Sequence, residues 1–151
     1  MLRDEAEYER WLDASRSSSR VADLASGAGE PAAACFHAEQ AAQLAIKALL
    51  HGLAVGDRAF GHSLVGLGRA VEDSLGVVLP EDLRDALARL ARHDIPIRYP
   101  DALPEGLIRE HYRQTDAAQA RADAGAVAEF AAILWAEAAD PEDELDEPVV
   151  Q

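Results

Sequence analysis

Apolar residues recur every three or four positions along most of the chain, and this spacing predicts amphipathic helices. A first helix is expected over residues 4–26, with Gly27 and Gly29 ending it. Pro31 then opens a second, alanine-rich helix that stops at Gly52, since a proline at the first helical position loses no hydrogen bond. The small side chains of this second helix allow it to lie close to a neighbouring helix.

Two shorter helices are predicted in the middle of the chain. One begins at His62 or Ser63 and ends at Gly76, and the next begins at Pro80. Three prolines within residues 96–105 prevent a regular helix there. Those residues therefore form a long connection, and such connections are often functional.

The last helix is expected after Asp116, which with Gln119 three residues later resembles a capping box, and it runs to about Ala139. No stretch alternates between apolar and polar residues for long enough to make a sheet. The pattern predicts an all-α protein, an antiparallel up-and-down bundle of four to five helices. The length of 151 residues suits one domain, here residues 1–139.

The end of the chain differs from the rest in charge. Residues 140–151 carry six acids and no base, so we predict a disordered, solvating tail. The whole chain has 28 acidic and 14 basic residues, a net charge of -14, and 22 against 14, or -8, remains without the tail. Such a charge argues against non-specific binding to nucleic acid or to an anionic membrane. It does not exclude a small, local basic site.

Signals for export or membrane insertion are not visible in the sequence. The first residues have no apolar signal core, and no run approaches the roughly 18 apolar residues of a membrane helix. A cytoplasmic protein that does not associate with membranes is expected.

Arginines gather in one part of the chain. Six of the 13 arginines lie between residues 84 and 113, where five acids leave a local charge of +1. The planar guanidinium group matches the geometry of phosphate, so this window is where phosphate binding is most expected. The alternative is a set of intramolecular salt bridges, and the sequence leaves both interpretations open.

Motifs for catalysis or metal binding are incomplete. Residues 56–63 have the glycine spacing of a phosphate-binding loop, but His62 replaces the required lysine and no strand precedes them, so a turn before a helix is predicted. Cys35 is the single cysteine, and no cluster of cysteine and histidine has zinc spacing. We therefore expect neither a metal nor a cofactor.

A polar stripe follows the second helix, where His37, Gln40, Lys47 and His51 share one side. The two histidines are about 21 Å apart at 1.5 Å per residue, so they cannot chelate one ion. The stripe is either a solvated face or part of a polar groove.

The proline-bearing connection contains Arg98, Tyr99 and Asp101 close together. Arg98 can bind phosphate, Tyr99 can stack or donate its hydroxyl, and Asp101 can orient the arginine. Alternatively, Arg98 and Asp101 pair with each other and fix the loop. Spacing alone does not choose between these roles.

Four blocks along the chain are similar to motifs of one family. They are Phe36, Gln40 and Lys47 with the following Ala48-Leu49-Leu50; Gly61-His62-Ser63-Leu64; Arg98-Tyr99-Pro100-Asp101; and Tyr112 with Ala117 before the alanine-rich last helix. In order and spacing these blocks resemble the HEPN domain family, the higher eukaryotes and prokaryotes nucleotide-binding domain. They cover about residues 8–139.

The resemblance implies a helical bundle that is commonly a homodimer. It also implies association with a minimal nucleotidyltransferase, in toxin–antitoxin-like or defence settings. Members are proposed to bind nucleotides, and some are metal-independent ribonucleases. The ligand-binding residues predicted for this chain are Arg98, Tyr99, Asp101 and Tyr112, with Lys47, Gln40 and His62 as further candidates.

The ribonuclease branch of the family uses an arginine followed by four to six residues and then a histidine. No arginine of this chain has a histidine at that spacing. We therefore expect a protein without catalytic residues that binds a nucleotide or RNA phosphate, or that partners a nucleotidyltransferase. Two alternatives are a ligand-free dimeric scaffold and a degenerate ribonuclease. The latter would combine Arg98 with a base from His62, His93, His111 or Asp101.

Overall fold

The computed structural model describes residues 3–61, 63–94, 101 and 103–138. Within these residues the chain forms five α-helices and two short 3-10 helices, and no strand. The elements are α1 (Glu5–Gly27), α2 (Pro31–Gly52), η1 (Gly56–Arg58), α3 (Leu64–Leu75), α4 (Glu81–Ala91), η3 (Ile108–Glu110) and α6 (Gln114–Glu137). The predicted all-α helical bundle is confirmed.

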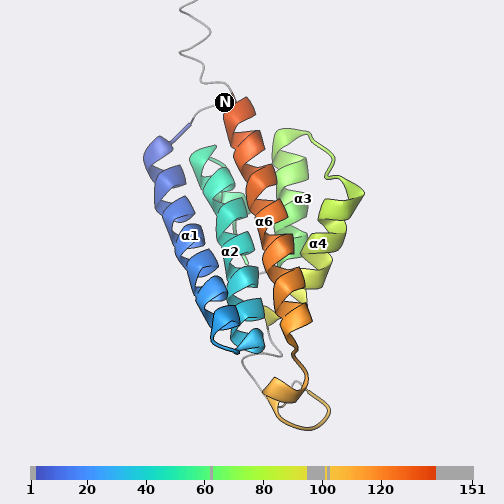
Figure 1. The fold of residues 1–151 in the computed structure, drawn as a ribbon. Helices are drawn as coiled ribbons and strands as arrows, with labels where there is room; N and C mark the ends of the chain where they lie inside the picture. The colour runs from blue at the N-terminus through green and yellow to red at the C-terminus, as the bar shows by residue number, and fades with distance from the viewer. Residues whose placement is uncertain (1–2, 62, 95–100, 102, 139–151) are drawn as a thin grey trace, which may run out of the picture.

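The helices form one bundle around α2 and α6 (Figure 1). α1 and α2 make an antiparallel hairpin, α6 packs along α2, and α4 packs against α6 with α3 beside it. Two ends of this bundle are referred to below. The N-terminal end holds the start of α1 and the ends of α2 and α6, and the loop end holds the start of α2, the end of α4, η3 and the start of α6.

The core consists mostly of alanine and leucine side chains, as the low aromatic content requires. α2 is the central helix, since 13 of its 22 residues are buried. Its buried alanines, such as Ala34, Ala38 and Ala42, let α1 and α6 approach its backbone closely. Aromatic side chains enter the core only near its two ends, among the described residues: Tyr8 and Trp135 at one, Tyr112 at the other.

Most helix boundaries agree with the sequence signals. The Asp4 carboxylate accepts a hydrogen bond from the Glu7 N–H at 3.0 Å at the start of α1. Ser63 caps α3 in the same way, with its Oγ 3.2 Å from the Gly66 nitrogen. α3 ends where Gly76 adopts φ 65°, a left-handed conformation that glycine reaches at little cost.

The predicted start of the last helix was wrong by three residues. α6 begins at Gln114, and Asp116 lies inside its first turn. The Asp116 carboxylate accepts a hydrogen bond from the Arg113 N–H at 2.8 Å. An acid at this third position stabilises the free N–H groups from inside the helix, as the glutamate of a capping box does.

The N-terminal end is closed by aromatic stacking. The rings of Tyr8 and Trp135 lie parallel with centroids 4.0 Å apart. The Arg3 guanidinium sits 3.9 Å above the Trp135 ring and donates a hydrogen bond to the Ala138 carbonyl at 2.5 Å. A Cβ atom on Gly52 would lie 2.6 Å from the Trp135 ring, so only glycine fits there.

Several predicted features lie outside the described residues: His62, the block Arg98-Tyr99-Pro100 and the acidic residues 140–151. In the parts of the chain that are described, no helix is long and apolar enough to cross a membrane.

Candidate functional site

The loop end brings together side chains from α2, α4 and α6. Tyr112 precedes α6, and its ring faces the imidazole of His93, with centroids 5.6 Å apart and the planes tilted by 55°. Tyr112 is 9% exposed and belongs to the core. Burial, with lesser contributions from Cys35 and Asp116, raises the pKa of Tyr112 to about 12, so its hydroxyl stays protonated at neutral pH.

His93 is the unusual residue of this group. Its Nδ1 atom is buried and, in the described part of the chain, has no hydrogen-bond partner. Burial lowers the pKa of His93, the carboxylates of Asp116 and Asp123 oppose this shift, and Arg92 adds to it. His93 is therefore a neutral imidazole at physiological pH, able to accept or donate a proton. A buried polar atom without a partner is uncommon in folded proteins.

Cys35 lies on the α2 side of the same group and is fully buried. Burial, and secondarily the Asp116 carboxylate, raises the pKa of Cys35 to about 12. Since the thiolate is the reactive form, this thiol is inert at neutral pH.

Gln40 is part of a polar group inside α2. Its Nε2 donates to Glu39 Oε2 at 2.8 Å, and Gln43 Nε2 donates to Glu39 Oε1. Glu39 is 0% exposed, which makes it a carboxylate within the core held by two amide groups. Gln40 thus supports Glu39, while remaining half-buried itself.

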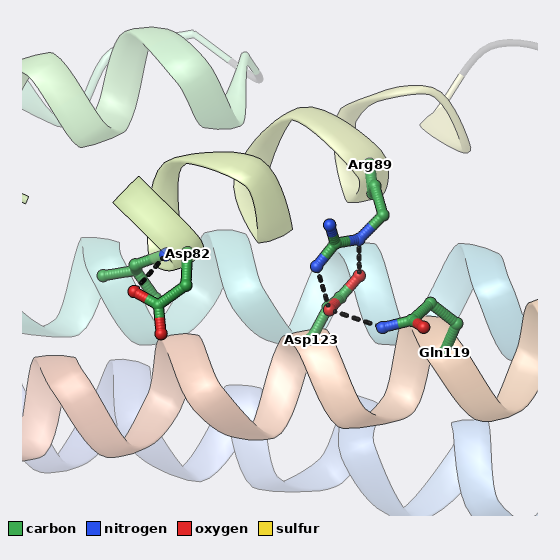
Figure 2. A network of polar contacts seen from close by, with 5 residues as sticks. Asp82, Arg89, Gln119 and Asp123 are labelled. Atoms are coloured by element: carbon green, nitrogen blue, oxygen red, sulfur yellow. Dashed lines mark hydrogen bonds and ion pairs between the residues drawn. The ribbon is translucent and has the colours of Figure 1, made fainter. Parts of the chain in front are cut away.

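A second polar group joins α4 to α6, as Figure 2 shows. Arg89 donates from Nε and Nη2 to the two carboxylate oxygens of Asp123, both at 2.9 Å. Gln119 Nε2 donates to Asp123 Oδ1 at 2.9 Å. The Asp123 side chain is 6% exposed and that of Arg89 is 43% exposed. This bidentate ion pair holds α4 against α6. It thereby positions the C-terminal end of α4, where the following connection begins.

The arginine-rich window divides into two kinds of residue. Arg89 and Arg84 form ion pairs, the latter with Glu72 at 2.7 Å, so the salt-bridge interpretation holds for these two. Arg92, Arg109 and Arg113 are exposed at the loop end. The phosphate-binding interpretation remains a prediction for these exposed arginines.

The remaining predicted ligand residues do not form one cluster. Asp101 is exposed in the connection before η3. Lys47 lies seven residues beyond Gln40 on α2, about 10 Å along the helix axis, towards the N-terminal end. There His51 stacks on Trp11, with centroids 4.4 Å apart. The polar stripe of α2 therefore serves two different ends of the bundle.

Metal binding has no support in the described residues. They contain no group of three or more histidine, cysteine, aspartate or glutamate side chains that could hold an ion.

Comparison with known proteins decides the family. The family model of the HEPN domain matches residues 8–134. The chain belongs to the HEPN domain family. Among solved structures, TT1696 from Thermus thermophilus is 38% identical, covers 83% of this chain and 96% of its own, and has a TM-score of 0.76. Comparison with curated proteins gives no match.

Two further structures bear the family name. ST0689, an archaeal HEPN homologue, is 26% identical, with coverage of 85% and 97% and a TM-score of 0.69. A HEPN domain protein from Thermotoga maritima, tm0613, is 26% identical, with coverage of 85% and 98% and a TM-score of 0.65. This HEPN chain thus shares its fold with family members over nearly their whole lengths.

Two buried acids of this HEPN protein, Glu39 and Asp123, were not predicted from the sequence. Both occupy positions on the apolar stripe of their helices, where a charged residue is rare unless paired. Asp123 follows Ala120 by three positions and precedes Val127 by four, both buried. An acidic residue at a position that continues the apolar spacing of a helix is the sequence signal that would have indicated these two buried acids.

Proposed function

We propose that this HEPN protein binds the phosphate of a nucleotide or of RNA at the loop end of the bundle, without cleaving it. Arg98 would clamp the phosphate, Asp101 would orient Arg98, and Tyr99 would face the base or ribose. Tyr112, which is buried just before α6, would contribute from the loop end of the bundle.

The observation that supports this proposal is the presence of several exposed arginines at the loop end of the bundle. Arg92 ends α4, Arg109 lies in η3, and Arg113 precedes α6, so three exposed arginines come from three elements at the loop end. α2 and α6 also begin there, and a helix N-terminus carries a partial positive charge. The exposed acids Asp101, Glu105 and Glu110 share this end, and residues 84–113 carry a charge of +1 in a chain with net charge -14.

The proposed partner is a minimal nucleotidyltransferase, in a toxin–antitoxin-like or defence setting, with the HEPN protein as a homodimer. Native mass spectrometry of the protein purified from its own host tests this assembly. A mass containing both chains supports it, and a HEPN chain that is always bare contradicts it.

Titration of the protein with a fluorescent ATP analogue and with a short single-stranded RNA tests the binding site. We expect Arg98→Ala to weaken binding about tenfold or more, the size of a lost charge-assisted hydrogen bond. Arg84→Ala is the matched control, because Arg84 pairs with Glu72 on the side of the bundle away from the loop end. Equal affinity of the wild type and Arg98→Ala would overturn the assignment.

A second candidate function, a degenerate ribonuclease, is favoured by His93. Its neutral imidazole with an unpartnered Nδ1 has the properties of a general base for a ribose 2′-hydroxyl, with Arg98 as the cation for the phosphate. Cleavage of single-stranded RNA in EDTA that His93→Gln abolishes would support it. His111→Gln, which alters an exposed loop histidine, should leave that cleavage unchanged. A ligand-free scaffold is the outcome if both assays are negative.

A further inference from the structure

A pocket of about 200 Å³ lies between α3 and α4, which run side by side at one side of the bundle (Figure 1). No residue of α2 or α6 lines it. Its wall on α3 runs from Val65 to Glu72, seven residues or about 10 Å along the helix axis. None of the described residues that were predicted to bind a ligand lines it. Since pockets for drug-sized ligands measure about 300–1,000 Å³, this pocket suits a smaller molecule.

The floor of the pocket is apolar and tightly packed. Leu79 and Leu87, which are 5% and 3% exposed, line the pocket together with Val65 and Ala88. Gly68 packs against both leucines, and a Cβ atom there would lie 2.9 Å from Leu87 Cδ1 and 3.1 Å from Leu79 Cδ1. The glycine therefore lets α3 and α4 approach closely at this level. A short apolar group that enters the pocket meets a closed apolar surface, and its removal from water favours binding.

The charged side chains that line the pocket carry a net charge of +1. Glu72 Oε2 accepts hydrogen bonds from the Leu79 N–H at 3.2 Å and from Arg84 Nη2 at 2.7 Å. These two contacts, in this order, lower the pKa of Glu72, so its carboxylate is ionised at neutral pH. Arg69 is exposed and forms no ion pair with any of the described residues. Two guanidinium groups thus face one carboxylate.

These features select an anion with a single charge and a short apolar group. The guanidinium of Arg69 can donate two parallel hydrogen bonds to a carboxylate. A dianion such as phosphate would exceed the charge of the pocket and would be repelled by Glu72. A cation would be repelled by Arg69 and Arg84. The apolar floor favours an alkyl chain over a fully hydrated anion.

We infer that the pocket between α3 and α4 binds a small organic monocarboxylate, with the carboxylate on Arg69 and the apolar chain on Leu79 and Leu87. The ligand is a free acid with a short chain. None of the residues that line the pocket belongs to the phosphate site proposed at the loop end. The inference therefore does not depend on that site.

Titration with hexanoate, followed by nuclear magnetic resonance, tests the ligand chemistry. We expect the amide signals of Gly68, Leu79 and Ala88 to shift, with a dissociation constant on the order of 1 mM. Hexylammonium, hexanol and inorganic phosphate should each bind at least about tenfold more weakly, because each lacks the single negative charge or the apolar chain. Hexylammonium or phosphate that binds as tightly as hexanoate would overturn the inference.

Two variants test the position of the ligand. Arg69→Gln should weaken hexanoate binding at least about tenfold, because it removes a charge-assisted contact. Ala88→Leu fills the pocket and should abolish binding, with the fold of each variant checked by circular dichroism. Arg20→Gln is the matched control, because Arg20 is an exposed arginine of α1. Its dissociation constant for hexanoate should equal that of the wild type.

Two results would contradict this position of the ligand. One is the absence of shifts in the wild type with hexanoate up to about 20 mM. The other is equal affinity of the wild type and Arg69→Gln. Arg98→Ala should leave hexanoate binding unchanged, so the failure of the loop-end site and the failure of this pocket are distinguishable.

A carboxylate next to a short apolar group also occurs at the C-terminus of a peptide. N-acetyl-leucine imitates such an end and separates this source from a free acid. Weaker binding of N-acetyl-leucine than of hexanoate would support a free acid. Equal or tighter binding would assign the pocket to the end of a peptide and overturn the inference of a free acid.

Discussion

The two ends of the bundle are built by different means. At the N-terminal end, Trp135 stacks on Tyr8 and Arg3 covers the indole, while the buried Nε of Arg3 has no hydrogen-bond partner among the described residues. At the loop end, the rings of Tyr112 and His93 face each other with their planes tilted by 55°. The buried Nδ1 of His93 has no hydrogen-bond partner among the described residues. The first end is closed by stacked rings, and the second holds the residues of the proposed binding site. Four predictions test this division.

Trp135→Ala should be the most damaging of the four changes. It removes a buried ring that Tyr8 and Arg3 both contact, so we expect a loss of about 3–5 kcal/mol in the free energy of unfolding, measured by urea denaturation. Ile133→Ala, on the same helix but 47% exposed, should change it by less than about 0.5 kcal/mol. A loss below about 1 kcal/mol for Trp135→Ala would remove the contrast between the two ends.

Gly52→Ala should destabilise by about 1–3 kcal/mol, because the added methyl group would lie 2.6 Å from the Trp135 ring and 2.8 Å from Tyr8 Cβ. Gly125→Ala is the matched control, since its methyl group meets open space and a helical alanine is favoured over glycine by up to about 1 kcal/mol. The melting temperature should therefore fall for Gly52→Ala and rise for Gly125→Ala. Shifts of the same sign would show that the N-terminal end can relax around a larger residue.

Acidification should reduce stability, and the loop end should contribute to this loss. Burial lowers the pKa of His37, His51 and His93 in the folded state, so the unfolded chain takes up protons first as the pH falls through about 6.5. The stabilisation is complete above that pH and is lost progressively below it. Melting temperatures between pH 8 and pH 5.5 should fall on the acidic side, and less steeply for His93→Phe. A melting temperature of the wild type that stays constant between pH 8 and pH 5.5 would contradict this prediction.

His93→Phe should have the smallest effect on stability at pH 8. Phenylalanine keeps the ring against Tyr112 and removes the buried nitrogen that lacks a partner, so we expect a change within about 0.5 kcal/mol. Urea denaturation of His93→Phe and Trp135→Ala under the same conditions compares their free energies of unfolding. A loss of several kcal/mol would mean that Nδ1 is bonded in the folded protein and that His93 is structural.

The sequence predicted the helices well and their partners poorly. Ser63 and Gly76 mark the start and the end of α3 as expected, because helix caps and left-handed turns are determined by a few neighbouring residues. The start of α6 was misplaced because an aspartate stabilises a helix equally from the cap or from the first turn. The family resemblance rested on ordered blocks and was confirmed, since these blocks span most of the bundle.

Contacts between distant segments could not be predicted. Arg89 and Asp123 are separated by 34 residues, and one sequence cannot say which of several arginines meets a given acid. The predicted ligand residues on α2, Gln40 and Lys47, shared a helical face, yet one supports Glu39 and the other lies nearer the opposite end. Periodicity places residues on a face, whereas the packing of neighbouring helices decides what that face meets.

The stacking of Tyr8 on Trp135 has a consequence for synthesis on the ribosome. The α1–α2 hairpin needs only neighbouring residues, so it can form while the rest of the chain is still being translated. The indole that completes its end is translated 127 residues after Tyr8. The nascent hairpin therefore leaves Tyr8 uncovered and Arg3 without its ring until α6 has been translated. Closure of the N-terminal end of the bundle thus depends on the synthesis of α6, although it involves residues of α1.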